Sequence, residues 1–386
     1  MSKRDKWTLP VASVITFLGF VDTHLLIPII ALYASGLGAS IGLVGLIVGL
    51  YSIVNTPANI VFGRFIDRVG YKRPLVVGLS GNVLSMLLYA FARSPLHLAM
   101  VRALHGLSGA LVAPATMSIV ADHAVSDRRG RAMSFYGMAL ACASLVGYPV
   151  SGVVASRLGV SAVFFLGASL VGLAIVLSMV LPGGDPAGRG PDSGGSLRKA
   201  RSLLTSRRLV PAYAAIFAQY FTFGSVVTLL PVHVERLGME AFEVGILLAT
   251  FSALFVLTQL PGGAISDRLG RRPPVFCGLS CVAISLVVLP SLSSFALLAG
   301  GMALYGVGYG LLFPSVSAMV ADHTAVGERG LAVGLFHALL TAGVAVGAPV
   351  MGLVAGLVGT PAALMLTAVP VLSAFVIAVA FLREPS

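Results

Sequence analysis

The sequence predicts an all-α membrane protein of twelve transmembrane helices, arranged as two pseudo-symmetric six-helix bundles. Of its 386 residues, 57% are hydrophobic and only 10% are charged, whereas about 25% are charged in a typical soluble domain. Apolar stretches of about 20 residues recur along the chain, each long enough to cross a hydrocarbon core about 30 Å thick. In addition, the second half of the chain repeats the first, which is the signature of an internally duplicated fold.

The apolar runs follow one another as six spans in each half of the chain. The first run comes after basic residues, as in a signal peptide, but it is too long and contains Asp22, so we expect an uncleaved helix. The expected spans are residues 9–34, 41–62, 74–92, 95–120, 133–156 and 161–181 in the first half, and 210–234, 242–265, 273–289, 295–320, 331–355 and 362–382 in the second.

The basic residues predict the orientation of these spans. The formal net charge is +11, and alternate loops hold nearly all of the Lys and Arg residues. With a cytoplasmic N-terminus, only Arg93, Arg157 and Arg236 face outward. Because cytoplasmic loops are enriched in Lys and Arg, both termini are expected to be cytoplasmic. The charge therefore reports membrane topology, and no nucleic-acid partner is expected.

The two halves align without a gap at a constant offset of 200 positions, from Gly63 against Gly263 to Gly159 against Gly359. About a third of these positions are identical. Six spans return the chain to the same side, so the halves are predicted to be parallel repeats with a solute site between them near the midplane. The expected domains are residues 1–181, a cytoplasmic linker with a basic amphipathic stretch at 182–208, and residues 209–386.

Two charged residues, Asp22 and Arg102, fall well inside predicted spans. Each costs about 2.5–3.5 kcal/mol at a helix centre and needs a partner or a wet cavity. One interpretation is a structural ion pair. The other is a proton-coupling device, because desolvation and a nearby cation act in opposite directions on a carboxyl group. His24 lies two residues from Asp22 and His105 three residues from Arg102, so both histidines are further candidates for the proton-coupling role. No metal site is expected, because no His, Cys or carboxylate cluster has metal-ligand spacing.

A loop motif is present once in each half. Residues 63–73 read GRFIDRVGYKR and residues 263–272 read GAISDRLGRR, and both resemble the G-x-x-x-D-R-x-G-R-[KR] signature of the major facilitator superfamily. This resemblance implies a conformational latch on the cytoplasmic side, with Asp67 reaching toward the helix that begins near residue 331 and Asp267 toward the one near residue 133. A topological role, in which the basic loops anchor the inside, is the alternative. The latch residues implied by the resemblance are Gly63, Asp67, Arg68, Gly70, Gly263, Asp267, Arg268 and Gly270.

Further motifs narrow the resemblance. The segment Arg102-Ala103-Leu104-His105-Gly106 is similar to R-x-x-Q-G in proton-coupled members, with His in place of Gln, and residues 147–152 (GYPVSG) resemble a degraded antiporter signature. The chain is therefore most similar to the twelve-helix drug/proton antiporters. This implies a proton-coupled secondary transporter, an exporter of a hydrophobic or amphiphilic small molecule that works by alternating access. It would use the proton gradient and no cofactor.

The expected partners are a lipophilic, cationic or lipid-like solute, protons and membrane lipids, and a monomer in a prokaryotic inner membrane is expected. A proton symporter or uniporter for a metabolite, or a lipid or glycolipid transporter, remains an alternative. An enzyme is disfavoured, because no nucleophile and base are paired. The candidate cavity residues are Phe20, Tyr51, Asn55, Tyr136, Gln219, Phe223, Gln259, Tyr305 and Tyr309.

Overall fold

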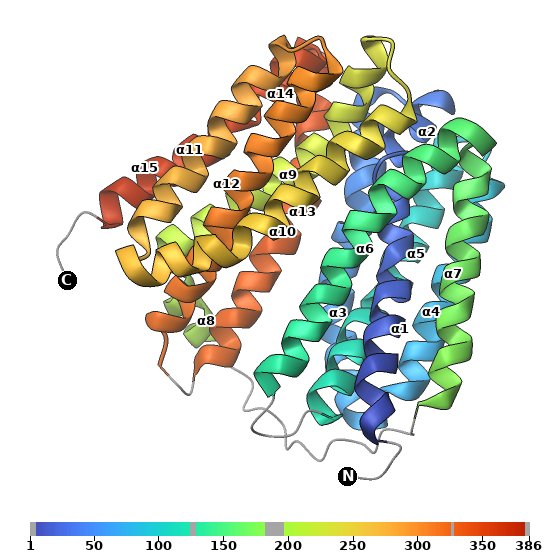
Figure 1. The fold of residues 1–386 in the computed structure, drawn as a ribbon, viewed down its shortest axis with the longest axis horizontal. Helices are drawn as coiled ribbons and strands as arrows, with labels where there is room; N and C mark the ends of the chain where they lie inside the picture. The colour runs from blue at the N-terminus through green and yellow to red at the C-terminus, as the bar shows by residue number, and fades with distance from the viewer. Residues whose placement is uncertain (1–4, 124–128, 182–196, 326–327, 383–386) are drawn as a thin grey trace. The chain divides into compact units, whose positions relative to one another are not determined.

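The computed structural model describes residues 5–123, 129–181, 197–325 and 328–382, and within these ranges every regular element is helical. The first half contains α1 (Asp5–Leu26), α2 (Ile30–Gly36), α3 (Ile41–Val69), α4 (Lys72–Ala90), α5 (Pro95–His123), α6 (Arg129–Leu158) and α7 (Val160–Val180). The second half contains α8 (Leu197–Leu204), α9 (Val210–Arg236), α10 (Ala241–Leu269), α11 (Arg272–Val288), η2 (Leu289–Ser291), α12 (Phe295–Asp322), α13 (Arg329–Val358), α14 (Thr360–Leu366) and α15 (Ala368–Leu382) (Figure 1).

The helices confirm the predicted spans. Eleven are long and apolar enough to cross a membrane, and a bent pair, Pro10–Leu26 with Ile30–Gly36, makes the twelfth. The sequence predicted one helix over residues 9–34, but the two parts meet at 41°. Pro28 lies in the break and has no N–H to continue the helical hydrogen bonds. The last span is also divided, at Thr367, three residues before Pro370.

The backbone repeats at the same offset as the sequence. The bounds of α10 are those of α3 moved by 200 positions. All described residues with positive φ are glycines, and they form three pairs at this offset: Gly38 and Gly238, Gly70 and Gly270, Gly159 and Gly359. Glycine adopts this left-handed region without steric cost, so each pair closes the corresponding helix connection in the two halves.

The contacts divide the chain into two compact units, one built mainly from residues before the linker and the other mainly from residues after it. In the first unit, α1 packs against α5, α6 and α7, while α4 packs against α5 and α7 (Figure 1). The Lys72 ammonium group donates to the carbonyl oxygens of Met179 (3.1 Å) and Leu181 (2.5 Å). These carbonyls lie at the C-terminal end of α7, where a cation is favourable.

In the second unit, α9 packs along α13 and α11 packs along α12. The α9–α13 contact is close because of Gly347, where a Cβ would lie only 2.1 Å from the carbonyl oxygen of Phe221. Helix α8 lies against α13, with Leu203 buried and Arg201 exposed. The described end of the basic stretch therefore folds as a short amphipathic helix, while residues 182–196 lie outside the described part of the chain.

We expect α8 to lie on the cytoplasmic side, and a single cysteine at the exposed Lys199 tests this. The Lys199→Cys variant is made after replacement of the native Cys142, Cys277 and Cys281. A membrane-impermeant maleimide should label it in inverted vesicles and leave it unlabelled in intact cells, because the positive-inside rule places this basic segment inside. Ready labelling in intact cells would reverse the assigned orientation.

Candidate functional site

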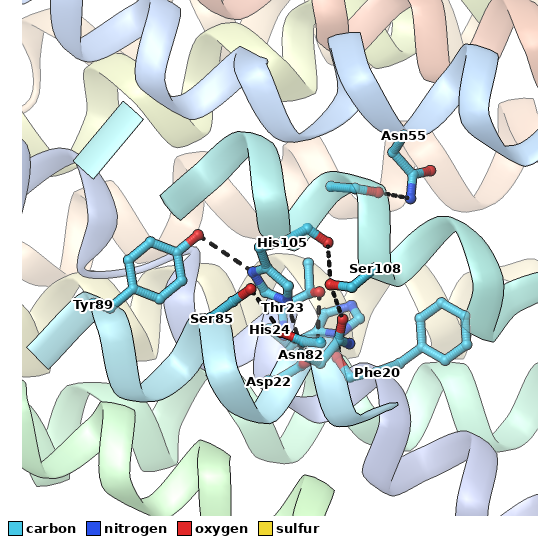
Figure 2. A network of polar contacts seen from close by, with 12 residues as sticks. Phe20, Asp22, Thr23, His24, Asn55, Asn82, Ser85, Tyr89, His105 and Ser108 are labelled. Carbon is cyan, nitrogen blue, oxygen red and sulfur yellow. Dashed lines mark hydrogen bonds and ion pairs between the residues drawn. The ribbon is translucent and has the colours of Figure 1, made fainter. Parts of the chain in front are cut away.

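Asp22 is fully buried in α1, and its two carboxylate oxygens have separate partners. Oδ1 accepts a hydrogen bond from the backbone N–H of Thr23 at 2.6 Å. Oδ2 accepts one from Asn82 Nδ2 of α4 at 2.8 Å and lies 3.2 Å from His105 Nε2 of α5 (Figure 2). Three helices thus converge on one carboxylate, and its closest titratable partner is an imidazole.

The contacts continue beyond the carboxylate. His105 Nδ1 lies 3.3 Å from the Tyr89 hydroxyl, so the fully buried imidazole connects Asp22 to Tyr89 (Figure 2). Ser108 Oγ donates to Asn82 Oδ1 at 2.6 Å, which orients the Asn82 amide with its nitrogen toward Asp22. A neutral His105 protonated on Nε2 would donate to Asp22 and accept from Tyr89. Asn82, Tyr89 and Ser108 were not among the predicted site residues; the feature that could have identified them is a polar or phenolic side chain inside an apolar span.

Arg102 lies one helical turn before His105 and is 3% exposed. Its guanidinium carbon lies 5.1 Å from the centroid of the Tyr51 ring, a cation–π distance. Within the described part of the chain, Arg102 Nε and Nη1 have no hydrogen-bond partner. The sequence predicted Asp22 and Arg102 as possible partners of each other. In the structure, Asp22 contacts the imidazole of His105, and the Arg102 guanidinium lies over the Tyr51 ring.

Gly106 sets the distance between α5 and α3. A Cβ at this position would lie 2.6 Å from the Tyr51 carbonyl oxygen, so only glycine allows this approach. The Asn55 amide nitrogen then donates to the Gly106 carbonyl at 3.0 Å, and Asn59 Nδ2 donates to Asn55 Oδ1 at 2.6 Å. The Tyr51 ring packs edge-on against His105 with centroids 5.2 Å apart. Tyr51 and Asn55 therefore lie beside Asp22, Arg102 and His105, which together form the ionisable cluster.

Three other predicted residues of the first unit have contacts of their own. His24 Nδ1 is hydrogen-bonded to the Phe20 carbonyl at 2.8 Å, and the His24 ring lies 5.4 Å from that of Tyr148. The partly buried Phe20 and Tyr136 pack against the apolar core of the bundle. The proton-coupling role of His24 and the cavity role of these two aromatic residues remain predictions.

The second unit has a buried cluster of hydroxyl groups. Thr222 Oγ1 lies 2.8 Å from the Tyr305 hydroxyl and 3.0 Å from the Tyr309 hydroxyl, and it donates to the Gln219 carbonyl at 2.7 Å. Gln219, Tyr305 and Tyr309 were predicted as site residues. Thr222 was missed, although it occupies the position of the second half that corresponds in sequence to Asp22. Phe223 is partly buried and packs against Phe251, Gln259 is partly buried, and Gln219 is fully buried.

The loop motif of the second unit forms a charge cluster. Arg271 Nη1 lies 2.5 Å from Asp267 Oδ1, and Arg271 Nε lies 2.9 Å from Asp322 Oδ2. Hydrogen bonds to Asp267 and then to Asp322 raise the pKa of Arg271, so this arginine stays charged throughout the physiological range. In the first unit Tyr71 occupies the position of Arg271, and the side chain of Asp67 lies outside the described part of the structure. Contacts of Asp67 and Asp267 with the opposite half remain predictions.

The fold and the buried cluster define a multi-pass integral membrane protein with a duplicated helical bundle and an ionisable group inside a span. The profile of the Major Facilitator Superfamily matches residues 12–246 and 212–386. The chain therefore belongs to this superfamily of transporters and is not an enzyme.

Similar proteins agree with this family. "Inner membrane transport protein YajR" of Escherichia coli (strain K12) is 25% identical over 360 residues, covering 92% of this chain and 78% of YajR. "Multidrug resistance protein 1" of Bacillus subtilis (strain 168) is 26% identical over 344 residues, covering 85% and 84% of the two chains. The inward-facing, unoccupied crystal structure of a bacterial homologue of the human lysosomal transporter Spinster has a TM-score of 0.85 at 15% identity and covers 100% of both chains. This likeness concerns the fold.

Proposed function

We propose that this chain is a proton-coupled secondary transporter that exports a hydrophobic or amphiphilic small molecule from a prokaryotic cell across the inner membrane by alternating access. The observation that carries the proposal is the contact between Asp22 and His105, both fully buried inside predicted spans. A carboxylate and an imidazole are both groups that bind and release protons, and ionisable side chains inside transmembrane spans mark proton relays. The proton gradient then supplies the energy.

The charges of the cluster favour exchange of solute against protons. Asp22 and Arg102 are the only buried Asp, Glu, Lys or Arg side chains among the described residues, and their formal charges cancel. A proton taken up by Asp22 or His105 leaves the cluster with one net positive charge, which burial disfavours. A cationic solute would add a positive charge to the same bundle. Solute and proton would therefore oppose each other's binding, which is the requirement for antiport.

A drug-like solute is supported by the similarity to a multidrug resistance protein and by the aromatic residues around Tyr309. A symporter or uniporter for a metabolite, or a lipid transporter, would use the same fold. These candidates differ in proton movement: an antiporter and a symporter move protons in opposite directions relative to the solute, and a uniporter moves none. Proton movement is followed in proteoliposomes with an internal pH indicator, and a lipophilic cation such as ethidium is the solute. Antiport should move protons in the direction opposite to ethidium, and symport should move both in the same direction.

The charge cluster of the loop motif is proposed to bias the balance between the outward- and inward-facing states. We expect Asp267→Asn, which cannot pair ionically with Arg271, to slow transport about two- to fivefold, the scale of a partly exposed ion pair. Asp67→Asn should impair transport as well. Initial rates in proteoliposomes and thermal unfolding measure both effects. Glu243→Gln, which removes a carboxylate at the other end of α10, is the control. Unchanged rates in both aspartate variants would leave the motif a purely topological role.

A further inference from the structure

The repeat offset gives the ionisable cluster a neutral counterpart in the second unit. Moving each position by 200 places Thr222 against Asp22, Tyr305 against His105 and Met302 against Arg102. Thr222 and Tyr305 are hydrogen-bonded to each other, just as Asp22 and His105 are in contact. The equivalent positions therefore hold a polar pair in both bundles, while Thr222, Tyr305 and Met302 carry no charge.

The hydrogen atoms of this neutral cluster are all used within it. Thr222 donates its hydroxyl hydrogen to the Gln219 carbonyl oxygen at 2.7 Å. The Tyr309 hydroxyl donates to the same oxygen. The Tyr305 hydroxyl lies 2.8 Å from both the Thr222 and the Tyr309 oxygens, so its hydrogen goes to one of them. Each hydroxyl has a single hydrogen, and the cluster has none left to offer a ligand.

In contrast to these hydroxyl groups, the side-chain amide of Gln219 has an acceptor oxygen to offer a ligand. Its Nε2 faces the Tyr309 carbonyl at 3.5 Å, the long limit of a hydrogen bond. Turning the amide over would set two acceptor oxygens against each other, so Oε1 must point away from this carbonyl. Oε1 is buried and has no hydrogen-bond partner within the described part of the chain. Since buried polar atoms are nearly always bonded, this oxygen is suited to receive a donor.

Aromatic rings flank the cluster. Tyr220 and Phe255 contact the Tyr309 ring with centroid distances of 6.1 and 5.8 Å, and Phe251 contacts it at 5.1 Å. Tyr220 and Phe255 are only partly buried. Ring faces of this kind suit an apolar or aromatic body, and they attract a positive charge.

We propose that Gln219 Oε1 and the surrounding rings form a recognition subsite for a hydrogen-bond donor, an N–H or O–H group, carried on the aromatic or apolar body of the solute. This inference rests on the proposed transport function and adds to it the polar feature that the solute must have. A solute offering only acceptors, such as a carboxylate, finds no free hydroxyl hydrogen in this cluster. Recognition of the donor belongs to the second unit, and the ionisable cluster belongs to the first.

The test compares two lipophilic cations, ethidium, which has amino N–H groups, and tetraphenylphosphonium, which has no donor. Binding of both is measured to the purified full chain in nanodiscs at one pH, without a gradient. Gln219→Met keeps the length of the side chain and removes the acceptor. It should weaken ethidium binding about 3- to 10-fold, the effect of one neutral hydrogen bond, and leave tetraphenylphosphonium binding unchanged. Ser285→Ala, which removes the hydrogen bond of a buried side chain of α11 to the Gly301 carbonyl of α12 in the same unit, should change neither.

Unchanged ethidium binding in Gln219→Met would overturn the subsite, as would equal weakening of both probes, which indicates general loss of packing. If Gln219→Met does not fold, ethidium is compared on the unaltered protein with its analogue whose amino groups are fully methylated. The analogue should bind about 3- to 10-fold more weakly, and equal affinity would overturn the subsite. Because no gradient is applied, failure of proton coupling in proteoliposomes would refute the proposed function without altering this result.

Discussion

Asp22→Asn should reduce gradient-driven transport to the background of protein-free liposomes while leaving the protein folded. Asparagine keeps the size of the side chain and one acceptor oxygen, which can still bind the Thr23 N–H, but it cannot take up a proton. His105 can turn its acceptor nitrogen toward the new amide, because a neutral imidazole exists in two tautomers. Solute binding and solute exchange at equal pH should therefore survive. Proton flux, solute uptake and melting temperature are measured on the same preparation.

Ser108→Ala is the matched control for this variant. It breaks the 2.6 Å hydrogen bond to Asn82, disturbing the cluster without removing a titratable group, and it should retain coupled transport. If Asp22 and His105 form only a structural ion pair, Asp22→Asn should instead lower stability by about 3–5 kcal/mol. Undiminished proton flux from a well-folded Asp22→Asn protein would end the assignment of Asp22 as the proton carrier and would turn attention to His105 and His24.

The fold was predictable from the sequence because the membrane imposes one requirement on every span. A helix must stay apolar for about 20 residues, and the runs were long enough to locate all twelve spans. The divisions at Pro28 and before Pro370 were missed. Proline often lies inside transmembrane helices without dividing them, as Pro57 does in α3 and Pro114 in α5. Whether a proline divides a helix depends on packing around it, which composition does not contain.

The site was predictable in part. A charged side chain in an apolar run stands out, and Asp22 and Arg102 are indeed buried. Their partners could not be read from spacing, because Arg102 and His105 lie on the same face of α5 and either could reach α1. The choice depends on Gly106, which brings Tyr51 close enough to hold the guanidinium. The hydroxyl cluster was only partly found, since Thr222 is an ordinary residue until it is compared with Asp22.

Arg102→Met should abolish gradient-driven transport and yet leave the melting temperature unchanged or raised. The Arg102 guanidinium is 3% exposed and its Nε and Nη1 are unbonded among the described residues, so its contact with the Tyr51 ring offsets only part of the cost of burying the charge. Replacing a whole buried ion pair by apolar groups is often neutral or stabilising, whereas removing one partner strands the other; here Asp22 keeps its contacts with Asn82 and His105 when Arg102 is replaced. The repeat shows that methionine suits this environment, since Met302 occupies the equivalent position and is fully buried.

The opposite effects on stability and transport separate function from structure at this position. If a residue serves only packing, its replacement should lower the stability of the protein. If it serves coupling, its replacement should impair transport alone. Arg102→Lys keeps the positive charge and removes the planar fork, so partial transport in this control would assign the role to the charge itself. A large fall in the melting temperature of Arg102→Met, by the equivalent of about 3–5 kcal/mol, would mean that Arg102 neutralises Asp22 as a structural partner. Normal coupled transport by a stable Arg102→Met protein would leave Asp22 and His105 to carry the proton without it.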